Sequence, residues 1–108
     1  MPEVNTSYEY SDNPQFENVM LEKSPEILRE FANDKTLHFW VAENPKTPPD
    51  VLVTIAKQHP DNYSISFALA VNPQTPLDIL QAISTHELFA FKPYLHTALA
   101  LHPAFNPV

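Results

Sequence analysis

Five histidines are the side chains of this sequence best suited to hold a metal ion or to exchange protons near neutral pH. They are spread along the chain, at His38, His59, His86, His96 and His102. No two of them have the His-x-x-x-His spacing that places two ligands on one helix face. The chain also contains no Cys, which excludes thiolate zinc sites and iron–sulfur sites. We therefore predict that the protein binds no metal and no cofactor.

Motifs for nucleophilic catalysis and for phosphate binding are missing as well. The sequence has no nucleophile elbow, no P-loop and no dinucleotide-binding fingerprint. It contains no Gly, the residue on which glycine-rich phosphate loops depend. The carboxylates Glu26, Asp50 and Asp78 each stand near a predicted helix start, where a carboxylate serves as part of a cap. We predict that the protein is not an enzyme.

One segment that occurs twice organises the chain. Residues 41–52 (VAENPKTPPDVL) return as residues 69–80 (LAVNPQTPLDIL), 28 residues later. Asn, Pro, Thr, Pro, Asp and Leu occupy the same places in both copies. Such internal repetition is typical of folds built from stacked repeats. In each copy Asn-Pro ends one element and opens a turn, because a residue ahead of Pro is disfavoured in a helix.

Hydroxyl side chains ahead of prolines predict where the helices begin. Thr47 and Thr75 fit the N-cap position, and each is followed by a Pro suited to the first helical position. Asp50 and Asp78, three residues after the threonines, can complete a capping box in place of the usual Glu. Ser24 is the predicted N-cap of an earlier, imperfect copy. A cap of this kind contributes about 1 kcal/mol to helix stability.

Apolar spacing predicts longer and shorter helices in alternation. Three longer helices have an apolar face, at residues 25–34, 48–58 and 76–84. Three shorter segments are apolar nearly all round, at residues 36–43, 65–71 and 94–101. The short segments suit two turns of α-helix or 3-10 helix. A strand is the alternative for residues 36–43, and the two Ala of residues 65–71 favour a helix.

The motif Val-Ala-x-Asn-Pro-x-Thr-Pro-x-Asp-Val-Leu resembles the leucine-rich repeat variant family. The match is close over residues 41–56 and 69–83. The resemblance implies an all-α fold, a short right-handed α-solenoid of about three repeats in which α and 3-10 helices alternate, with no sheet. It implies no enzymatic activity. Some members carry a Cys-rich iron–sulfur domain, and the lack of Cys means that this function does not transfer.

Acidic residues concentrate near the N-terminus. Residues 1–34 contain eight acidic and two basic residues, and the whole chain has a net charge of −7. We predict a flexible acidic arm at residues 1–17 and a helical repeat domain at residues 18–108. Direct binding of nucleic acid is disfavoured, because it needs a basic surface. The longest apolar run, residues 67–71, is too short to span a membrane, and we expect a cytoplasmic protein.

A protein–protein interaction module is the function these features favour. The candidate contact residues are Glu26, Glu30, Trp40 and Phe67, and the acidic N-terminal third favours a basic partner protein. The apolar segment 99–105 predicts self-association or partner binding at the C-terminal end. The alternative function is that of a small acidic inhibitor, or immunity-type protein, that occludes a basic site on its target.

Overall fold

A computed structural model describes residues 14–105, and this part of the chain consists of helices and turns without strands. The prediction of an all-α fold is therefore confirmed, and residues 36–43 do not form a strand. The seven α-helices of residues 14–105 are α1 (Phe16–Leu21), α2 (Pro25–Phe31), α3 (His38–Glu43), α4 (Pro49–Gln58), α5 (Tyr63–Val71), α6 (Leu77–Ser84) and α7 (Pro93–Leu101). Two 3-10 turns are described, η2 (Lys35–Leu37) and η3 (Glu87–Phe89).

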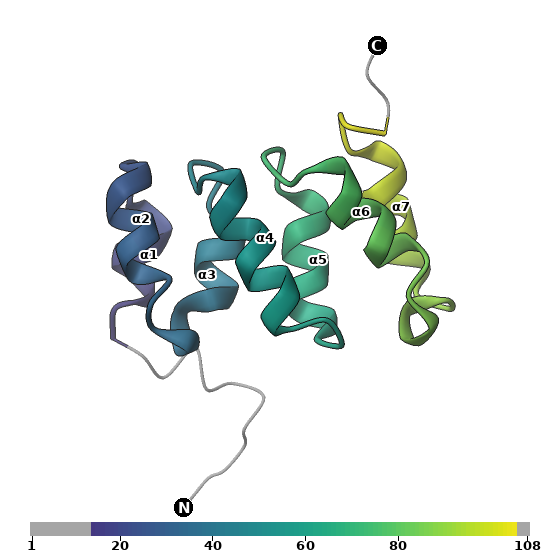
Figure 1. The fold of residues 1–108 in the computed structure, drawn as a ribbon, viewed down its shortest axis with the longest axis horizontal. Helices are drawn as coiled ribbons and strands as arrows, with labels where there is room; N and C mark the ends of the chain where they lie inside the picture. The colour runs from purple at the N-terminus through teal and green to yellow at the C-terminus, as the bar shows by residue number, and fades with distance from the viewer. Residues whose placement is uncertain (1–13, 106–108) are drawn as a thin grey trace, which may run out of the picture.

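The helices form two layers that follow the chain from one end of the molecule to the other. In Figure 1, α2, α4 and α6 lie toward the viewer, with α1, α3, α5 and α7 behind them. Within the rear layer α3 packs against both α1 and α5, and α5 packs against α7. The described molecule is flat, with extents of 42 × 33 × 19 Å. The right-handed superhelix that the family resemblance implies stays a prediction.

A row of leucines at equivalent repeat positions forms the front half of the core. Leu28 of α2, Leu52 of α4 and Leu80 of α6 are each fully buried. Val41 of α3 and Leu69 of α5 meet them from the rear layer, and both are also buried. The predicted alternation of apolar-faced helices with wholly apolar helices therefore produces the two layers, since each front helix buries one face and each central rear helix buries most of its sides.

The expectation of alternating α and 3-10 helices is wrong in one respect. The second helix of each unit, α3, α5 or α7, is an α-helix, and within residues 14–105 3-10 geometry is confined to the three-residue turns η2 and η3. The hydrogen bonds of a 3-10 helix have poorer geometry, so runs beyond one turn are uncommon. In the middle unit Asn62 removes the need for a 3-10 turn, because its side chain accepts a hydrogen bond from the Ile65 N–H and caps α5 directly.

The predicted caps are correct at Ser24 and wrong at the two threonines. The Ser24 hydroxyl accepts a hydrogen bond from the Ile27 N–H at 3.4 Å. At α4 and α6 the N-cap position is held by the extended prolines Pro48 and Pro76, with no side-chain cap. Thr47 and Thr75 precede these prolines with both side chains buried.

The two threonines point into the core rather than along the helix that follows each of them, so neither can cap that helix. Thr47 Oγ1 donates a hydrogen bond to the Val41 carbonyl near the end of α3, at 2.7 Å. Thr75 Oγ1 is buried and has no hydrogen-bond partner in the described part of the chain. Asp50 and Asp78 form no capping box with them and stand in the second position of their helices.

The described residues include the last part of the predicted arm, residues 14–17. Residues 1–13, most of the predicted arm, lie outside the described residues. Helix α1 begins at Phe16, and its ring lies 5.2 Å from that of Trp40 between centroids. None of the described helices has the length and apolar character required to cross a membrane.

Candidate protein-docking surfaces

Two repeated asparagines hold successive units together. Asn44 Nδ2 donates to the carbonyl of Val19 in α1 and to that of Glu22, both at 2.8 Å. One repeat later, Asn72 Nδ2 donates to the carbonyls of Ala42 and Asn44, at 2.7 and 3.0 Å. The carbonyls at a helix C-terminus have no partner within their own helix. Each asparagine therefore both opens its own turn and satisfies the end of the rear helix one unit earlier.

His102 takes the asparagine's place in the last unit. Its Nε2 donates to the Asn72 carbonyl at 2.7 Å, and its Nδ1 accepts from the Ala104 N–H at 3.0 Å. These two bonds fix the neutral tautomer with the proton on Nε2. His102 is also the C-cap of α7.

His38 and His59 form a hydrogen-bonded pair. His38 Nε2 donates to the Ala32 carbonyl at 2.7 Å, and His38 Nδ1 lies 2.9 Å from His59 Nε2. One proton fits between the two rings, and a second would set two N–H groups against each other. The pKa of His59 is lowered, first by burial and then by the charges of His38 and Lys35. The pair joins His38 of α3 to His59, the C-cap of α4.

The two other histidines are also engaged in local contacts. His86 accepts from the Leu88 N–H at Nδ1, so its Nε2 donates to Asp61, at 2.8 Å. His96 Nε2 donates to the Phe89 carbonyl at 2.8 Å. In residues 14–105 no group of three or more His, Cys, Asp or Glu side chains is arranged to hold a metal ion.

The predicted acidic contacts lie on α2, apart from the predicted aromatic contacts. Glu26 accepts a hydrogen bond from the Ser24 hydroxyl at 3.0 Å. Its pKa is lowered by a backbone hydrogen bond and by Ser24, so this carboxylate also serves the helix start. Glu30 is exposed on the same helix. Trp40 and Phe67 belong to α3 and α5 in the other layer, and the structure does not join the four residues into one site.

Trp40 and Phe67 have different neighbours even within the rear layer. Trp40 is half-buried and packs edge-on against Phe39, with ring centroids 4.9 Å apart. Phe67 lines a surface hollow with Phe39, Tyr63 and three further residues of α3 and α5, closed at one side by Tyr94 of α7. Phe39, rather than Trp40, is therefore the α3 aromatic that shares a surface with Phe67.

Two adjoining hollows on the rear layer share Phe67 and Tyr94 as walls. Each has a volume of about 390 Å³. We call this surface the aromatic groove, defined by Phe39, Tyr63, Phe67, Val71, Tyr94 and Leu101. Tyr94 and Leu101 of α7 are 78% and 76% exposed. Glu43 lies in the groove, and burial raises the pKa of its carboxyl group.

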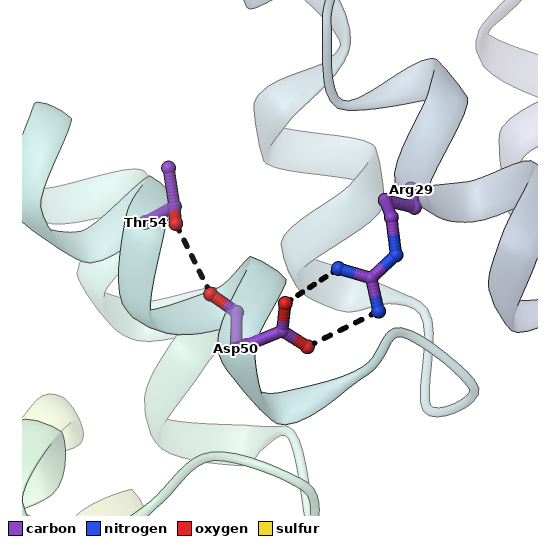
Figure 2. Close-up of polar contacts among 3 residues, drawn as sticks. All are labelled: Arg29, Asp50 and Thr54. Atoms are coloured by element: carbon purple, nitrogen blue, oxygen red, sulfur yellow. Dashed lines mark hydrogen bonds and ion pairs between the residues drawn. The ribbon is translucent and has the colours of Figure 1, made fainter.

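The front layer carries two grooves between successive units. The first inter-unit groove, between α2 and α4, has a volume of about 200 Å³ and is lined by Arg29, His38 and Asp50 among others. Arg29 Nη1 and Nη2 reach the two Asp50 carboxylate oxygens at 2.5 and 3.3 Å (Figure 2). The guanidinium group lowers the pKa of Asp50. The second inter-unit groove, between α4 and α6, is larger, at about 330 Å³.

Sequence reasoning missed the exposed side of α7 and the crossing bonds of the asparagines. Tyr94 is 78% exposed, and this exposure depends on how α7 is turned against α5. The signal for the asparagines was present, since both lie in the repeated motif. That an asparagine occupies a turn does not by itself predict a hydrogen bond to the preceding unit, because such a bond depends on the distance between the stacked units.

The repeat motif can be compared with known families. No curated protein and no solved structure gives a significant match to the chain. Residues 41–87 match the sequence model of the Leucine Rich Repeat Variant domain. That range contains both copies of the motif together with α4, α5 and α6. The resemblance to this family is thus confirmed over residues 41–87.

Proposed function

We propose that this protein is a non-enzymatic helical-repeat module that docks another protein in its aromatic groove. The observation that carries the proposal is the apolar surface that α5 and α7 share. Val71, Tyr94 and Leu101 are large side chains that remain 50–78% exposed around two adjoining hollows. Exposed apolar surface that is contiguous and hollowed is typical of interaction sites.

The side chains that line the aromatic groove favour a partner segment that is apolar over one that binds only through its charges. Among the residues that the structure describes, Glu43 is the one Asp, Glu, Lys or Arg that lines either hollow. A partner that inserts aliphatic or aromatic side chains would bury Phe67, Tyr94 and Leu101 and gain about 25 cal/mol for each Å² of apolar surface removed from water. The rear helices are held by the asparagine bonds before binding, so little ordering entropy opposes docking.

The acidic-inhibitor alternative receives less support from the described residues. It needs an acidic face that mimics nucleic acid or blocks a basic site. On α2, Arg29 stands between Glu26 and Glu30, and Glu26 is engaged with the helix start. We propose docking as the first function and keep occlusion as a prediction for the N-terminal third as a whole.

Site-specific photo-crosslinking in cells tests the docking proposal. A benzoylphenylalanine placed at Tyr94 should capture a discrete partner, because position 94 borders both hollows. The matched control places the same crosslinker at Gln74, which is exposed on a turn and lines neither hollow. Leu101→Ser should weaken capture at position 94, whereas Leu88→Ser, also an exposed leucine, should not. Equal capture at positions 94 and 74, or capture indifferent to Leu101, would contradict the proposal.

A further inference from the structure

The two inter-unit grooves of the front layer are built from equivalent repeat positions. From α3 and α4 to α5 and α6, six lining residues are displaced by 28 positions, as His38/Ser66, Asp50/Asp78, Val51/Ile79, Thr54/Ala82, Ile55/Ile83 and Gln58/His86. From α2 to α4 the displacement is 24 positions, which places Val53 where Arg29 stands and Lys57 where Asn33 stands. The buried Leu28, Leu52 and Leu80 confirm this alignment. The grooves can therefore be compared position by position.

Two exchanges make the second groove the more open of the two. The buried imidazole of His38 is replaced by the small Ser66 side chain, which lines the second groove. Arg29, which reaches across the first groove to Asp50, is replaced by Val53, which is too short and apolar to do so. The volume rises from about 200 to about 330 Å³ between the two grooves.

Because Val53 stands in place of Arg29, the Asp78 carboxylate lacks the cation that Asp50, its equivalent in the first groove, has. Asp50 is held by both guanidinium nitrogens of Arg29 (Figure 2). Asp78 occupies the same position in the first turn of α6 and is exposed at the groove. Among residues 14–105, no basic side chain lies within ion-pair distance of Asp78. The second groove thus offers a carboxylate beside an apolar hollow.

We propose that the second inter-unit groove binds an arginine side chain of a partner protein. The guanidinium would pair with Asp78 as Arg29 pairs with Asp50, and the aliphatic stem would pack on Ala56, Ile79 and Ile83. The planar fork of arginine suits a bidentate contact that the lysine ammonium cannot make. The inference rests on the proposed function that the chain docks proteins, but it concerns the opposite layer.

Lys57 sets the strength of this site. It lines the same groove from α4, at the position that the neutral Asn33 holds in the first groove. Its ammonium group repels an incoming guanidinium. Lys57 therefore counteracts the attraction by Asp78 and keeps the binding of a single arginine weak. Neutralising Asp78 should therefore weaken the binding of arginine, whereas neutralising Lys57 should strengthen it. A merely acidic surface would not produce these opposite effects.

The experiment is an NMR titration of the ¹⁵N-labelled full chain with N-acetyl-arginine amide. N-acetyl-citrulline amide, which has nearly the same shape without the charge, is the matched ligand control. Saturable shifts should centre on Ser66, Asp78 and Ile79. Asp78→Asn should weaken binding about tenfold, the effect of one charge-assisted pair. Asp50→Asn, the equivalent change in the first groove, should leave it unchanged. Lys57→Gln should strengthen it about twofold.

A second variant keeps the test decisive. Val53→Arg supplies in the same chain the arginine that the second groove lacks, and it should abolish the saturable shifts. Equal binding of citrulline, or equal binding by Asp78→Asn, would overturn the arginine site. The outcome is separate from that of crosslinking at position 94. Arginine binding without a crosslinked partner would support this site and count against the aromatic groove. A crosslinked partner without arginine binding would support the aromatic groove and count against this site.

Discussion

The clearest test of the local physics concerns two threonines in equivalent places with unequal partners. Thr47 Oγ1 bonds to the Val41 carbonyl, whereas Thr75 Oγ1 is buried with no partner in the described residues. Thr47→Val should cost about 1–2 kcal/mol of unfolding free energy, because it removes a buried hydrogen bond. Thr75→Val should be neutral or stabilising by about 1 kcal/mol, since it removes an unsatisfied hydroxyl. Urea denaturation of both variants measures the difference, and equal losses would contradict it.

The His38–His59 pair makes stability depend on pH in a defined direction. The folded pKa of His59 is lowered below its ordinary value by burial and by the neighbouring charges. The unfolded chain therefore binds more protons as the pH falls through the ordinary histidine range, near 6.5. Stability should be full above that range and should decline below it. Urea midpoints from pH 7.5 to 5.5 should fall less steeply in His59→Gln than in the unaltered chain, and parallel slopes would remove His59 as the cause.

At the scale of the elements, the asparagines decide whether successive units stay together. The Asn72 side chain makes three hydrogen bonds, two from its amide NH₂ to the carbonyls of Ala42 and Asn44 and one accepted from the Gln74 N–H. Asn72→Ala should destabilise the chain by about 2–4 kcal/mol, because two buried carbonyls lose a donor. The matched control is Asn62→Ala, which removes only the part-buried cap bond from the Ile65 N–H and should cost about 1 kcal/mol. Similar losses in the two variants would show that Asn72 acts only as a turn residue.

The elements also show what could be predicted from the sequence. Helix positions follow from apolar spacing and proline placement, both of which are local, and Ser24 was placed correctly for the same reason. The role of Thr47 was not predictable, because the pattern Thr-Pro-x-Asp fits a cap equally well until the extended Pro48 turns the hydroxyl inward. The aromatic groove depends on the stacking of α5 against α7, which local patterns do not encode.

At the scale of the whole molecule, the sequence predicts that the C-terminal end is covered by self-association or by a partner protein, and the exposed face of α7 gives the first possibility a definite test. Apolar burial is insensitive to ionic strength, whereas ionic contacts weaken as salt is added, and the acidic residues of two copies would repel each other. Light scattering after size-exclusion chromatography should therefore show a dimer that grows with protein concentration and persists in high salt. Leu101→Ser should shift it to monomer, because Leu101 is 76% exposed and borders the hollow beside Tyr94.

The same measurement separates self-association from docking of another protein. A stable specific interface buries about 800 Å² on each partner, which requires more of α7 than Leu101 alone, so Tyr94→Ser should act in the same direction. Met20→Ser, an exposed apolar residue on α1 at the other end of the molecule, is the matched control and should leave the dimer intact. A monomer at every concentration would leave the aromatic groove free for a different protein. A dimer would mean that a partner must displace the second copy, so capture at position 94 should then fall as the concentration of the chain rises.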